Sequence, residues 1–400
     1  MLNYTLFGES HGPVVGVLME NVPAGWTVDD AFIAGQLLRR SGKGGLTTAR
    51  READTVEYLC GVFEGKTTGD PLVAVLRNGD VHAGDYEKLK NTPRPGHADY
   101  AAWVKAGGCS DYRGGGHHSG RLTAPLVVAG SIAQTYLRER GITIAAEVVE
   151  EEDLRQRAAE ARGEGDSVGG EIRCSITGLP AGLGGFGWKE AVDSEIARQI
   201  FAIPAVKALG FGDGAAFAGL RGSEANDALR TDGGQITMTS NHAGGVNGGI
   251  TNGMPLTFTV TFRPTPSIGK PQETVDITTM SDVEITVEGR HDACIVLRAA
   301  PAVEAAAALA ILRLLPGEDS LAGYRRELDE IDSRLVELYE CRMETAKKIG
   351  AYKKAHQLPV RDEAREAEVL RSRGDLAPEH RQQVEEVFRM LMRHSREEQS

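Results

Sequence analysis

The 400-residue sequence lacks the marks of several protein classes. Its five cysteines are widely scattered and form no C-x-x-C pair, so the sequence indicates neither a disulfide framework nor a zinc site. No apolar run approaches the roughly 20 residues that a membrane-spanning helix needs, and the chain begins without a basic and apolar leader. We therefore expect a cytoplasmic protein whose cysteines are buried for packing.

Positive charge is also in deficit. Lys and Arg number 45 against 57 Asp and Glu, which gives a net charge of −12 and disfavours non-specific binding to nucleic acids or membranes. Any anionic ligand must therefore be captured by local groups of arginines. With 41% hydrophobic and 26% charged residues, the composition is that of an ordinary globular protein, and we expect small-molecule partners.

Two nucleotide-binding motifs are missing. Gly42-Lys43 and Gly269-Lys270 lack the upstream glycine and the following hydroxyl of the phosphate-binding loop G-x-x-x-x-G-K-[ST]. No G-x-G-x-x-G follows a predicted strand. Hydrolysis of a nucleoside triphosphate and ordinary dinucleotide binding therefore lose support.

Glycine is scarce in one part of the chain. Of 49 glycines, three lie in 320–400, and this tail has a helical pattern almost throughout. We therefore predict two domains, 1–316 and 317–400. In the first, short apolar segments separated by helices and long glycine-rich loops favour an α+β layered fold over a regular βαβ series. The predicted strands are Val14–Leu18, Val56–Val62, Leu72–Leu76, Ile142–Val149, Ile172–Ile176, Leu256–Phe262 and Ile295–Leu297. The predicted helices are Val28–Arg40, Ala124–Arg138, Lys189–Ile203 and Ala302–Leu315.

The stretch from Pro93 to Ala124 concentrates polar chemistry. It holds three histidines, three arginines and the triple glycine Gly114–Gly116, directly before an apolar helical run. Backbone N–H groups at such glycines and the N-terminal end of the helix form a cradle for an anion, beside which imidazoles can act as acids. A glycine-rich surface turn with solvated side chains is the alternative.

Other segments repeat this combination of glycines and polar groups. Arginine pairs at 39–40 and 50–51 flank a glycine loop and suit bidentate binding of phosphate and carboxylate. The string at 8–12 matches the G-x-S-x-G of serine hydrolases, but too few residues precede it for the central strand that such a turn follows. His11 is a candidate general acid, and a serine hydrolase using Ser10 is the rival interpretation.

Together these segments resemble the chorismate synthase family along residues 1–316. The resemblance implies an α+β fold, built as a layered β-α-β sandwich. It also implies anti-1,4 elimination of phosphate from 5-enolpyruvylshikimate 3-phosphate to give chorismate, with reduced FMN as cofactor and NADPH as a candidate reductant. The strings that carry it are GESHG at 8–12, LRR at 38–40, TT-x-RRE-x-D at 47–54, GVFEGKTTGDP at 61–71, RPGHADY at 94–100, DYRGGG at 111–116, RPTPSIG at 263–269 and GRHDAC at 289–294.

The same resemblance implies roles for individual residues. His11 protonates the departing phosphate, His97 protonates the reduced flavin, and Asp292 assists loss of the substrate hydrogen near the flavin N5. Substrate phosphate and carboxylates are bound by Arg39, Arg40 and Arg51. The flavin contacts are His117, His118, Ser119, Gly248, Arg263, Pro264, Thr265, Pro266, Ser267 and Arg290. His117 and His118 stand where the family has arginine and serine, so this segment departs from the family pattern.

The tail predicts an amphipathic helix of about thirty residues, which begins near Leu321 and carries Arg342 on its apolar stripe. An unpaired guanidinium is costly there, so a bound anion explains Arg342 better than a coiled-coil dimerisation arm does. Lys353 lies about 16 Å along almost the same face and can reach the same ligand. Arg325 lies about 25 Å the other way and cannot serve that ligand within one straight helix.

Residues 321–399 resemble the all-helical chorismate mutases, which are dimers with a long first helix that completes the partner's site. The resemblance implies conversion of chorismate to prephenate without a nucleophile. Arg325, Arg342 and Arg365 then bind the two carboxylates, Lys353 and Gln399 contact the ether oxygen, and Asp362, Glu366 and Ser395 hold the hydroxyl side. We expect a homo-oligomer, a tetramer in which mutase domains pair. A non-catalytic dimerising or ligand-sensing tail is the alternative.

Overall fold

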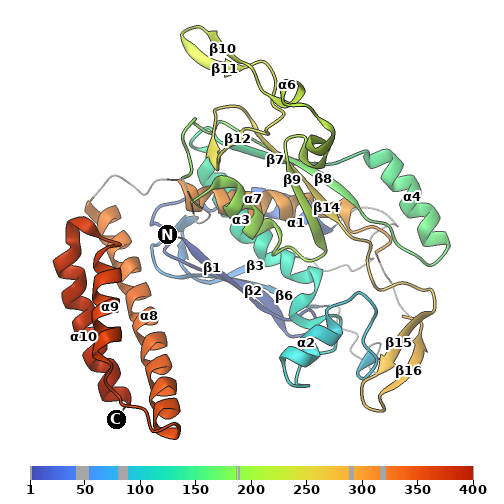
Figure 1. Cartoon of the computed structure of the whole chain (residues 1–400). Coiled ribbons are helices and arrows are strands. Elements are labelled where there is room, and N and C mark those ends of the chain that lie inside the picture. The colour runs from blue at the N-terminus through green and yellow to red at the C-terminus, as the bar shows by residue number, and fades with distance from the viewer. Residues whose placement is uncertain are drawn as a thin grey trace. The chain divides into compact units, whose positions relative to one another are not determined.

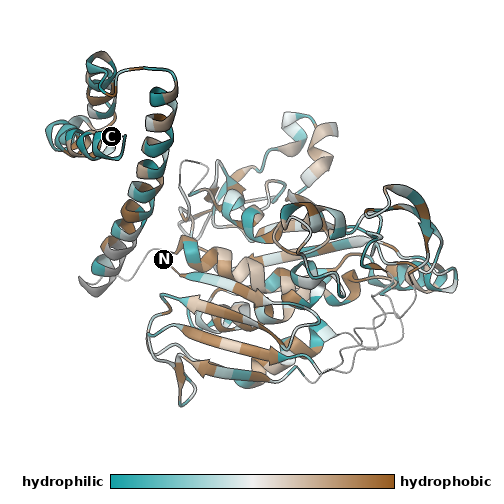
Figure 2. Cartoon of the chain, turned by 90° about the horizontal axis from the view of Figure 1, so that it is seen from below, coloured by the Kyte–Doolittle hydropathy of each residue, from teal (hydrophilic) through white to brown (hydrophobic). Residues whose placement is uncertain are grey.

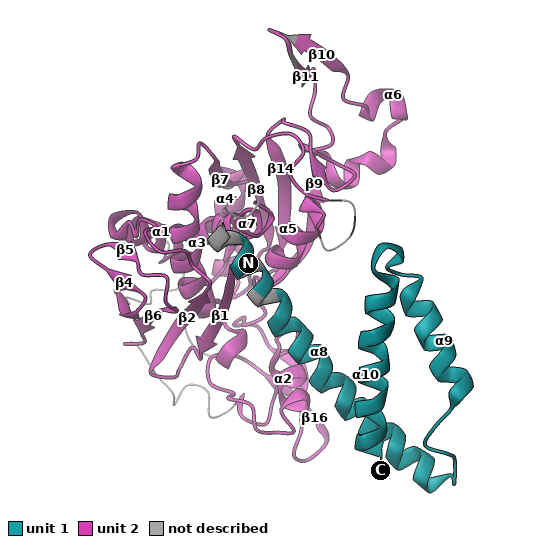
Figure 3. Ribbon diagram, turned by 90° about the vertical axis from the view of Figure 1, so that its left-hand side faces the viewer, with its two compact units in different colours: residues 1, 316–400 teal, residues 2–315 magenta. Residues whose placement is uncertain are grey.

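The structure is a computed structural model and describes residues 2–41, 54–79, 89–185, 187, 190–287, 292–315 and 321–399. The chain divides into two compact units, the sandwich unit (Leu2–Leu315) and the helical unit (Pro316–Ser400), which are considered separately (Figure 3). No helix within the described ranges is long and apolar enough to cross a membrane.

Two four-stranded antiparallel sheets form the outer layers of the sandwich unit (Figure 1). The first sheet has the strand order β1-β2-β6-β3, and the second has the order β7-β8-β14-β9. In β14 every second residue from Leu256 to Phe262 is buried, as expected of a strand with one face on the core. The strands are β1 Asn3–Gly8, β2 Val14–Glu20, β3 Val56–Cys60, β6 Leu72–Arg77, β7 Thr143–Val148, β8 Gly170–Thr177, β9 Val206–Phe211 and β14 Leu256–Phe262.

A layer of helices lies between the sheets, and Figure 2 shows the apolar residues that line this core. Helices α3 and α7 pack against each other and are apolar on almost all sides, as expected of central helices. They approach so closely that a Cβ on Gly130 would overlap the side chain of Ala305. The predicted layered α+β sandwich is therefore confirmed. The helices of the layer are α1 Asp30–Ser41, α3 Thr123–Arg138, α5 Val192–Ile200 and α7 Ala300–Leu314.

Shorter elements connect the layers. The small strand pairs are β4 Val62–Phe63 with β5 Lys66–Thr67, β10 Leu229–Asp232 with β11 Gln235–Met238, β12 Val246–Asn247 with β13 Ile250–Thr251, and β15 Gln272–Asp276 with β16 Ser281–Ile285. The peripheral α-helices are α2 Asp99–Lys105, α4 Glu151–Gly163 and α6 Gly222–Ala225. The 3₁₀ turns are η2 Gly116–His118, η3 Gly120–Leu122, η4 Gly214–Gly219, η5 Val296–Arg298 and η6 Pro378–His380.

Two sequence predictions are wrong in the sandwich unit. Ile295–Leu297 was expected to be a strand, but Val296–Arg298 forms the 3₁₀ turn η5, because its N–H groups bond three residues back and the chain runs directly into α7. The expectation that all cysteines are buried holds for Cys174 and Cys294 only. The exposed cysteines are Cys60, Cys109 and, in the helical unit, Cys341.

In residues 321–399, the described part of the helical unit, there are three α-helices, α8 Leu321–Ala355, α9 Glu363–Gly374 and α10 Arg381–Gln399, and the 3₁₀ turn η6 lies between α9 and α10. The long first helix that the sequence predicts is therefore present. Among the described residues of this unit, the buried apolar side chains are Met343, Ala346 and Met392. Helix α8 leaves its N-terminal apolar stripe exposed, at Leu328, Ile331, Leu335 and Leu338. A single helical unit thus buries only part of its apolar surface.

Candidate functional site

A cavity of about 790 Å³ lies in the sandwich unit and is walled by loops from both sheets and by the start of α7. Its volume is in the upper part of the range typical of ligand sites. It brings together residues that lie far apart in the sequence, among them His11, His97 and Asp292. The predicted site residues that line it are His11, Arg40, His97, His117, His118, Ser119, Arg263, Thr265, Pro266, Ser267 and Asp292.

His11 follows the first strand and is held in place by two neighbours. Ser10 is buried, and its Oγ lies 3.1 Å from His11 Nδ1. Gly114 has a positive φ of 60° and lies against the imidazole, so that a Cβ there would overlap the ring and come within 2.9 Å of Ser10 Oγ. The triple glycine therefore packs against His11 and leaves no room for another side chain at position 114.

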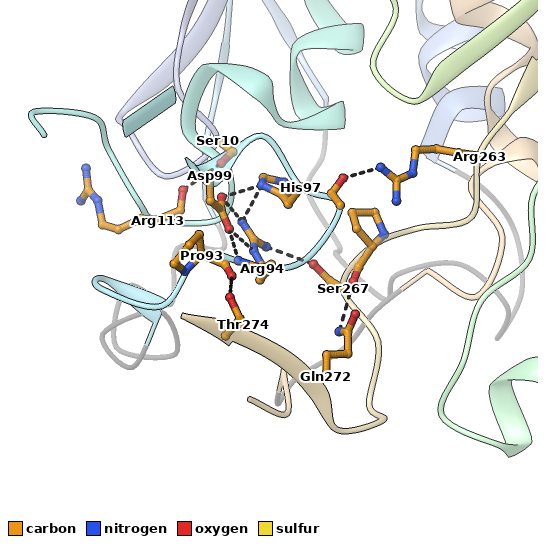
Figure 4. A network of polar contacts seen from close by, with 12 residues as sticks. Ser10, Pro93, Arg94, His97, Asp99, Arg113, Arg263, Ser267, Gln272 and Thr274 are labelled. Carbon is orange, nitrogen blue, oxygen red and sulfur yellow. Dashed lines mark hydrogen bonds and ion pairs between the residues drawn. The ribbon is translucent and has the colours of Figure 1, made fainter. Parts of the chain in front are cut away.

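His97 forms a compact polar group with Asp99 and Arg94, shown in Figure 4. His97 Nδ1 lies 2.5 Å from Asp99 Oδ1, and the buried Arg94 donates from Nε to Asp99 Oδ2 at 2.7 Å. Burial alone raises the pKa of Asp99, but the hydrogen bonds from Arg94 and His97 outweigh it and hold that pKa well below its usual range. Asp99 is therefore a carboxylate at neutral pH.

The segment 93–97 is joined to the segment 263–274 by three hydrogen bonds (Figure 4). Arg94 Nη1 donates to Ser267 Oγ at 3.0 Å, and Arg263 donates to the carbonyl of Gly96. The other contacts are Thr274 Oγ1 to the Pro93 carbonyl at 2.5 Å, and Gln272 Nε2 to the Pro266 carbonyl at 3.5 Å within the second segment. The strings RPGHADY and RPTPSIG thus form one continuous wall of the cavity.

Two buried guanidinium groups share one carboxylate at another part of the cavity wall. Arg40 donates to Asp54 Oδ2 at 2.9 Å and to Thr123 Oγ1 at 3.2 Å, and Arg121 donates to Asp54 Oδ1. Burial lowers the pKa of Arg40 to about 10, although Asp54 opposes this. Two positive charges on one negative charge leave a net positive charge. Arg40 lines the cavity, and its Nε is buried without a hydrogen-bond partner in the described structure.

Asp292 is paired with Arg298, whose Nη2 donates to Asp292 Oδ2 at 2.6 Å. Arg298 comes from the turn η5, lines the same cavity, and has a buried Nε with no partner among the described atoms. The sequence prediction did not single out Arg298, and it likewise missed Arg94, Asp99 and Asp54 as site residues. The motif strings contained Arg94, Asp99 and Asp54, and a search for carboxylates within those strings could have found the last two.

The adjacent histidines His117 and His118 both line the cavity. His117 Nδ1 lies 3.2 Å from the carbonyl oxygen of Gly8, which places this residue beside the end of β1. Burial and the neighbouring His117 and His97 lower the pKa of His118, so His118 favours the neutral form.

Some predicted residues do not line this cavity. Arg39 instead forms a two-point ion pair with the buried Glu304 of α7, at 2.7 and 3.0 Å. Gly248 lies in the turn between β12 and β13, and Pro264 lies between two lining residues without lining the cavity itself. Arg51 and Arg290 fall outside the described residues.

In the helical unit, Arg342 of α8 meets the end of α10. Arg342 donates to Ser395 Oγ and to the Leu391 carbonyl at 2.8 Å, and burial lowers the pKa of Arg342. Gln399 packs against Gly350, about two turns beyond Arg342 on α8. The Gln399 Oε1 is buried and has no partner in the described part of the chain.

The other predicted residues of this unit lie on α8, on α9 or between them. Lys353 donates to the Val360 carbonyl at 2.6 Å, which holds the loop before α9. Asp362 caps α9 by accepting from the Arg365 backbone N–H at 3.0 Å. The remaining contacts are Arg396 to Glu366, and Arg365 to Glu368 at 2.6 Å. Arg325 is exposed on α8.

Comparisons with known proteins agree with this division of the chain. The family model of chorismate synthase matches residues 2–153 and 147–315, and the model of chorismate mutase type II matches residues 324–400. The chain is 44% identical over 338 residues to the chorismate synthase of Thermococcus gammatolerans, covering 78% of this chain and 95% of the relative. It is also 44% identical over 345 residues to that of Aeropyrum pernix, covering 78% and 90%. A crystal structure of chorismate synthase aligns with a TM-score of 0.63 at 25% identity, covering 83% of this chain and 98% of that one.

Proposed function

We propose a two-step function from the premise that this chain belongs to the chorismate synthase family and carries a chorismate mutase type II domain after it. The sandwich unit eliminates phosphate from 5-enolpyruvylshikimate 3-phosphate to give chorismate, and the helical unit rearranges chorismate to prephenate. The main support for the first step is that one cavity is lined by His11, His97 and Asp292. The buried Arg40 lines the same cavity.

We propose that the cavity holds a flavin beside the substrate. Its volume of about 790 Å³ suits two ligands together, and the Oγ1 of Thr265, a lining residue, is buried without a partner among the described residues. We propose that FMN is held by Arg263, Thr265 and Ser267 from one segment and by His118 and Ser119 from another. Reduced FMN, when bound, supplies the electron density and the hydrogen acceptor that a redox-neutral elimination requires. NADPH is the proposed reductant.

The residues of the cavity divide the remaining work. Arg40, with Arg121 behind Asp54, binds the anionic substrate by charge-assisted hydrogen bonds. His11 donates a proton to the phosphate oxygen as the C–O bond breaks, so that phosphate leaves as a weaker base. Asp292 assists removal of the substrate hydrogen, for which the bound flavin would be the acceptor, and His97 holds a proton beside the cofactor.

In the helical unit no nucleophile is required, because the rearrangement is intramolecular. We propose that Arg342 and Arg365 bind the carboxylates, with Lys353 and Gln399 at the ether oxygen, where charge develops. The buried and unpartnered Oε1 of Gln399 supports a ligand at this place. We propose that Asp362, Glu366 and Ser395 hold the hydroxyl side of the ligand.

We propose that helical units pair as dimers within a homotetramer. The exposed stripe on α8 supports this pairing, because it leaves apolar surface that a partner helix can cover. Arg325, which is exposed on the same helix, then reaches the partner's site. The same exposed stripe also favours the second candidate, a dimerising tail without catalysis.

One experiment tests both steps. The full-length protein is supplied anaerobically with reduced FMN and the phosphorylated substrate, and phosphate, chorismate and prephenate are followed together. We expect phosphate first and prephenate as the final product. If the protein is dimeric and chorismate accumulates without prephenate, the tail is a dimerising arm without catalysis. The serine hydrolase would be supported instead if the protein released no phosphate with reduced flavin but hydrolysed an ester, and if Ser10→Ala abolished that hydrolysis.

A further inference from the structure

The carboxylate of Asp99 makes four short polar contacts with two residues of its own loop, Arg94 and His97, and it is largely shielded from solvent. Arg94 binds it through the backbone N–H at 3.1 Å, through Nε at 2.7 Å and through Nη2 at 2.9 Å. His97 Nδ1 completes the set at 2.5 Å. The carboxylate therefore has a fixed position, and it holds the His97 ring by one nitrogen (Figure 4).

The contact with Asp99 indicates where the proton of His97 lies. An unprotonated ring nitrogen and a carboxylate oxygen both carry lone pairs and repel, so their close approach is favourable when a hydrogen lies between them. Because Asp99 is ionised, that hydrogen belongs to Nδ1, which donates it. Arg94 Nη2 lies 3.2 Å from the same nitrogen, but two donors cannot bond each other, so its effect on His97 is that of a neighbouring positive charge.

With Nδ1 engaged, Nε2 is the nitrogen that can meet a ligand. His97 lines the cavity, and its Nε2 edge lies beside Gly115, where a Cβ would be 3.1 Å away. Charged or titratable groups beside the ring include Arg94 and Asp99 from its own loop, His118 from the turn η2, and Arg263, which donates to the neighbouring Gly96 carbonyl. Ser267, which also binds Arg94, carries no charge.

We propose that Asp99 is a positioning residue, which holds the proton of neutral His97 on Nδ1 so that Nε2 alone takes up and delivers the catalytic proton. Arg94 holds Asp99 in place and offsets its negative charge. The kinetic consequence rests on the proposed role of His97 as an acid, whereas the position of the proton does not. Two experiments separate these claims.

The first experiment reads the proton directly. The full-length protein is labelled with ¹⁵N-histidine, and the His97 signals are assigned by their loss in His97→Gln. In neutral His97 we expect a protonated Nδ1 and an unprotonated Nε2, and Asp99→Asn should remove this preference. A protonated Nε2 in the neutral ring of the native protein would overturn the proposal, whether or not the protein turns over substrate.

The second experiment measures the pH profile of flavin-dependent phosphate release. Asp99→Asn should lower kcat by about 10²- to 10⁴-fold with little change in KM, because the ring loses its fixed tautomer. The two variants should also shift the alkaline limb of kcat in opposite directions. Asp99→Asn moves it to lower pH, since the imidazolium loses a negative neighbour, and Arg94→Gln moves it to higher pH, since Asp99 is no longer offset.

The matched controls make the same chemical changes in an exposed ion pair of α4, as Asp153→Asn and Arg157→Gln. Both should leave kcat and its pH profile unchanged. A purely structural role for Asp99 would lower the thermal stability and the fraction of active protein without moving the alkaline limb. Shifts of the same sign in the two loop variants, or no shift in either, would contradict the proposal.

Discussion

Replacing Gly114 by alanine should impair catalysis by displacing His11. The added Cβ overlaps the imidazole ring, so the ring must retreat by more than about 1 Å to restore a carbon contact of roughly 3.5 Å. A displacement of this size at a reacting group costs about 10²-fold in rate. Alanine at a positive φ of 60° also strains the backbone by about 1 to 2 kcal/mol, which thermal unfolding would record.

The matched control is Gly141→Ala. Gly141 has a φ of 77°, but a Cβ there meets nothing within 4 Å, so the variant has the same kind of backbone strain without the clash. We expect both variants to lose similar stability, and only Gly114→Ala to lose kcat in anaerobic phosphate release. If Gly114→Ala kept its kcat to within about twofold of the native protein, the placement of His11 against the triple glycine would be refuted.

Three further predictions concern other contacts. Arg298→Gln should lower kcat for phosphate release by about 10- to 100-fold, because Asp292 loses a charge-assisted hydrogen bond of roughly 1.5 to 3 kcal/mol that helps to position it. An unchanged kcat in steady-state assays would exclude this role. Asp54→Asn should lower the free energy of unfolding at pH 7 by about 3 to 5 kcal/mol, because two buried guanidinium groups lose the negative charge that they share. Burial raises the pKa of Asp54, but Arg40 and Arg121 outweigh it and hold that pKa below its usual range. The stabilisation by the Asp54 carboxylate is therefore present at neutral pH and is lost as the pH falls below about 3.9. The difference in the free energy of unfolding between the variant and the native protein should narrow in acid. Gly350→Ala should lower prephenate formation while chorismate formation persists, because a Cβ there lies 2.8 Å from Gln399 Cα; equal rates of both products in the variant would contradict it.

The sequence predicts the regular elements well where one face of the chain is apolar. Leu256–Phe262 is found with the predicted bounds, because strict alternation specifies a half-buried strand. The turn at Val296–Arg298 was misread because three apolar residues are compatible with a strand or with the start of a helix. Only the continuation of the chain into α7 decides between them.

The candidate site was predictable only in part, for a geometrical reason. Motif strings contain His11, His97 and Asp292, but they do not say which neighbour each one contacts. Arg39 and Arg40 are adjacent in the sequence and lie about 100° apart around α1, so one pairs with Glu304 and the other reaches the cavity. The direction of each side chain depends on the docking of α1 against α3 and α7, which pattern alone does not specify.

The position of α7 has a consequence for how the protein is made. This helix occupies the centre of the sandwich, yet it is the last of that unit's helices and strands to be synthesised. Both sheets therefore leave the ribosome before the helix that fills the space between them, and their inner faces lack this helix until residue 314 has emerged. The helical unit follows in the chain and keeps the sandwich attached to the ribosome while α7 docks. A chain truncated before α7 would expose the apolar faces of its sheets and aggregate, whereas a chain truncated after α7 would still form the complete sandwich.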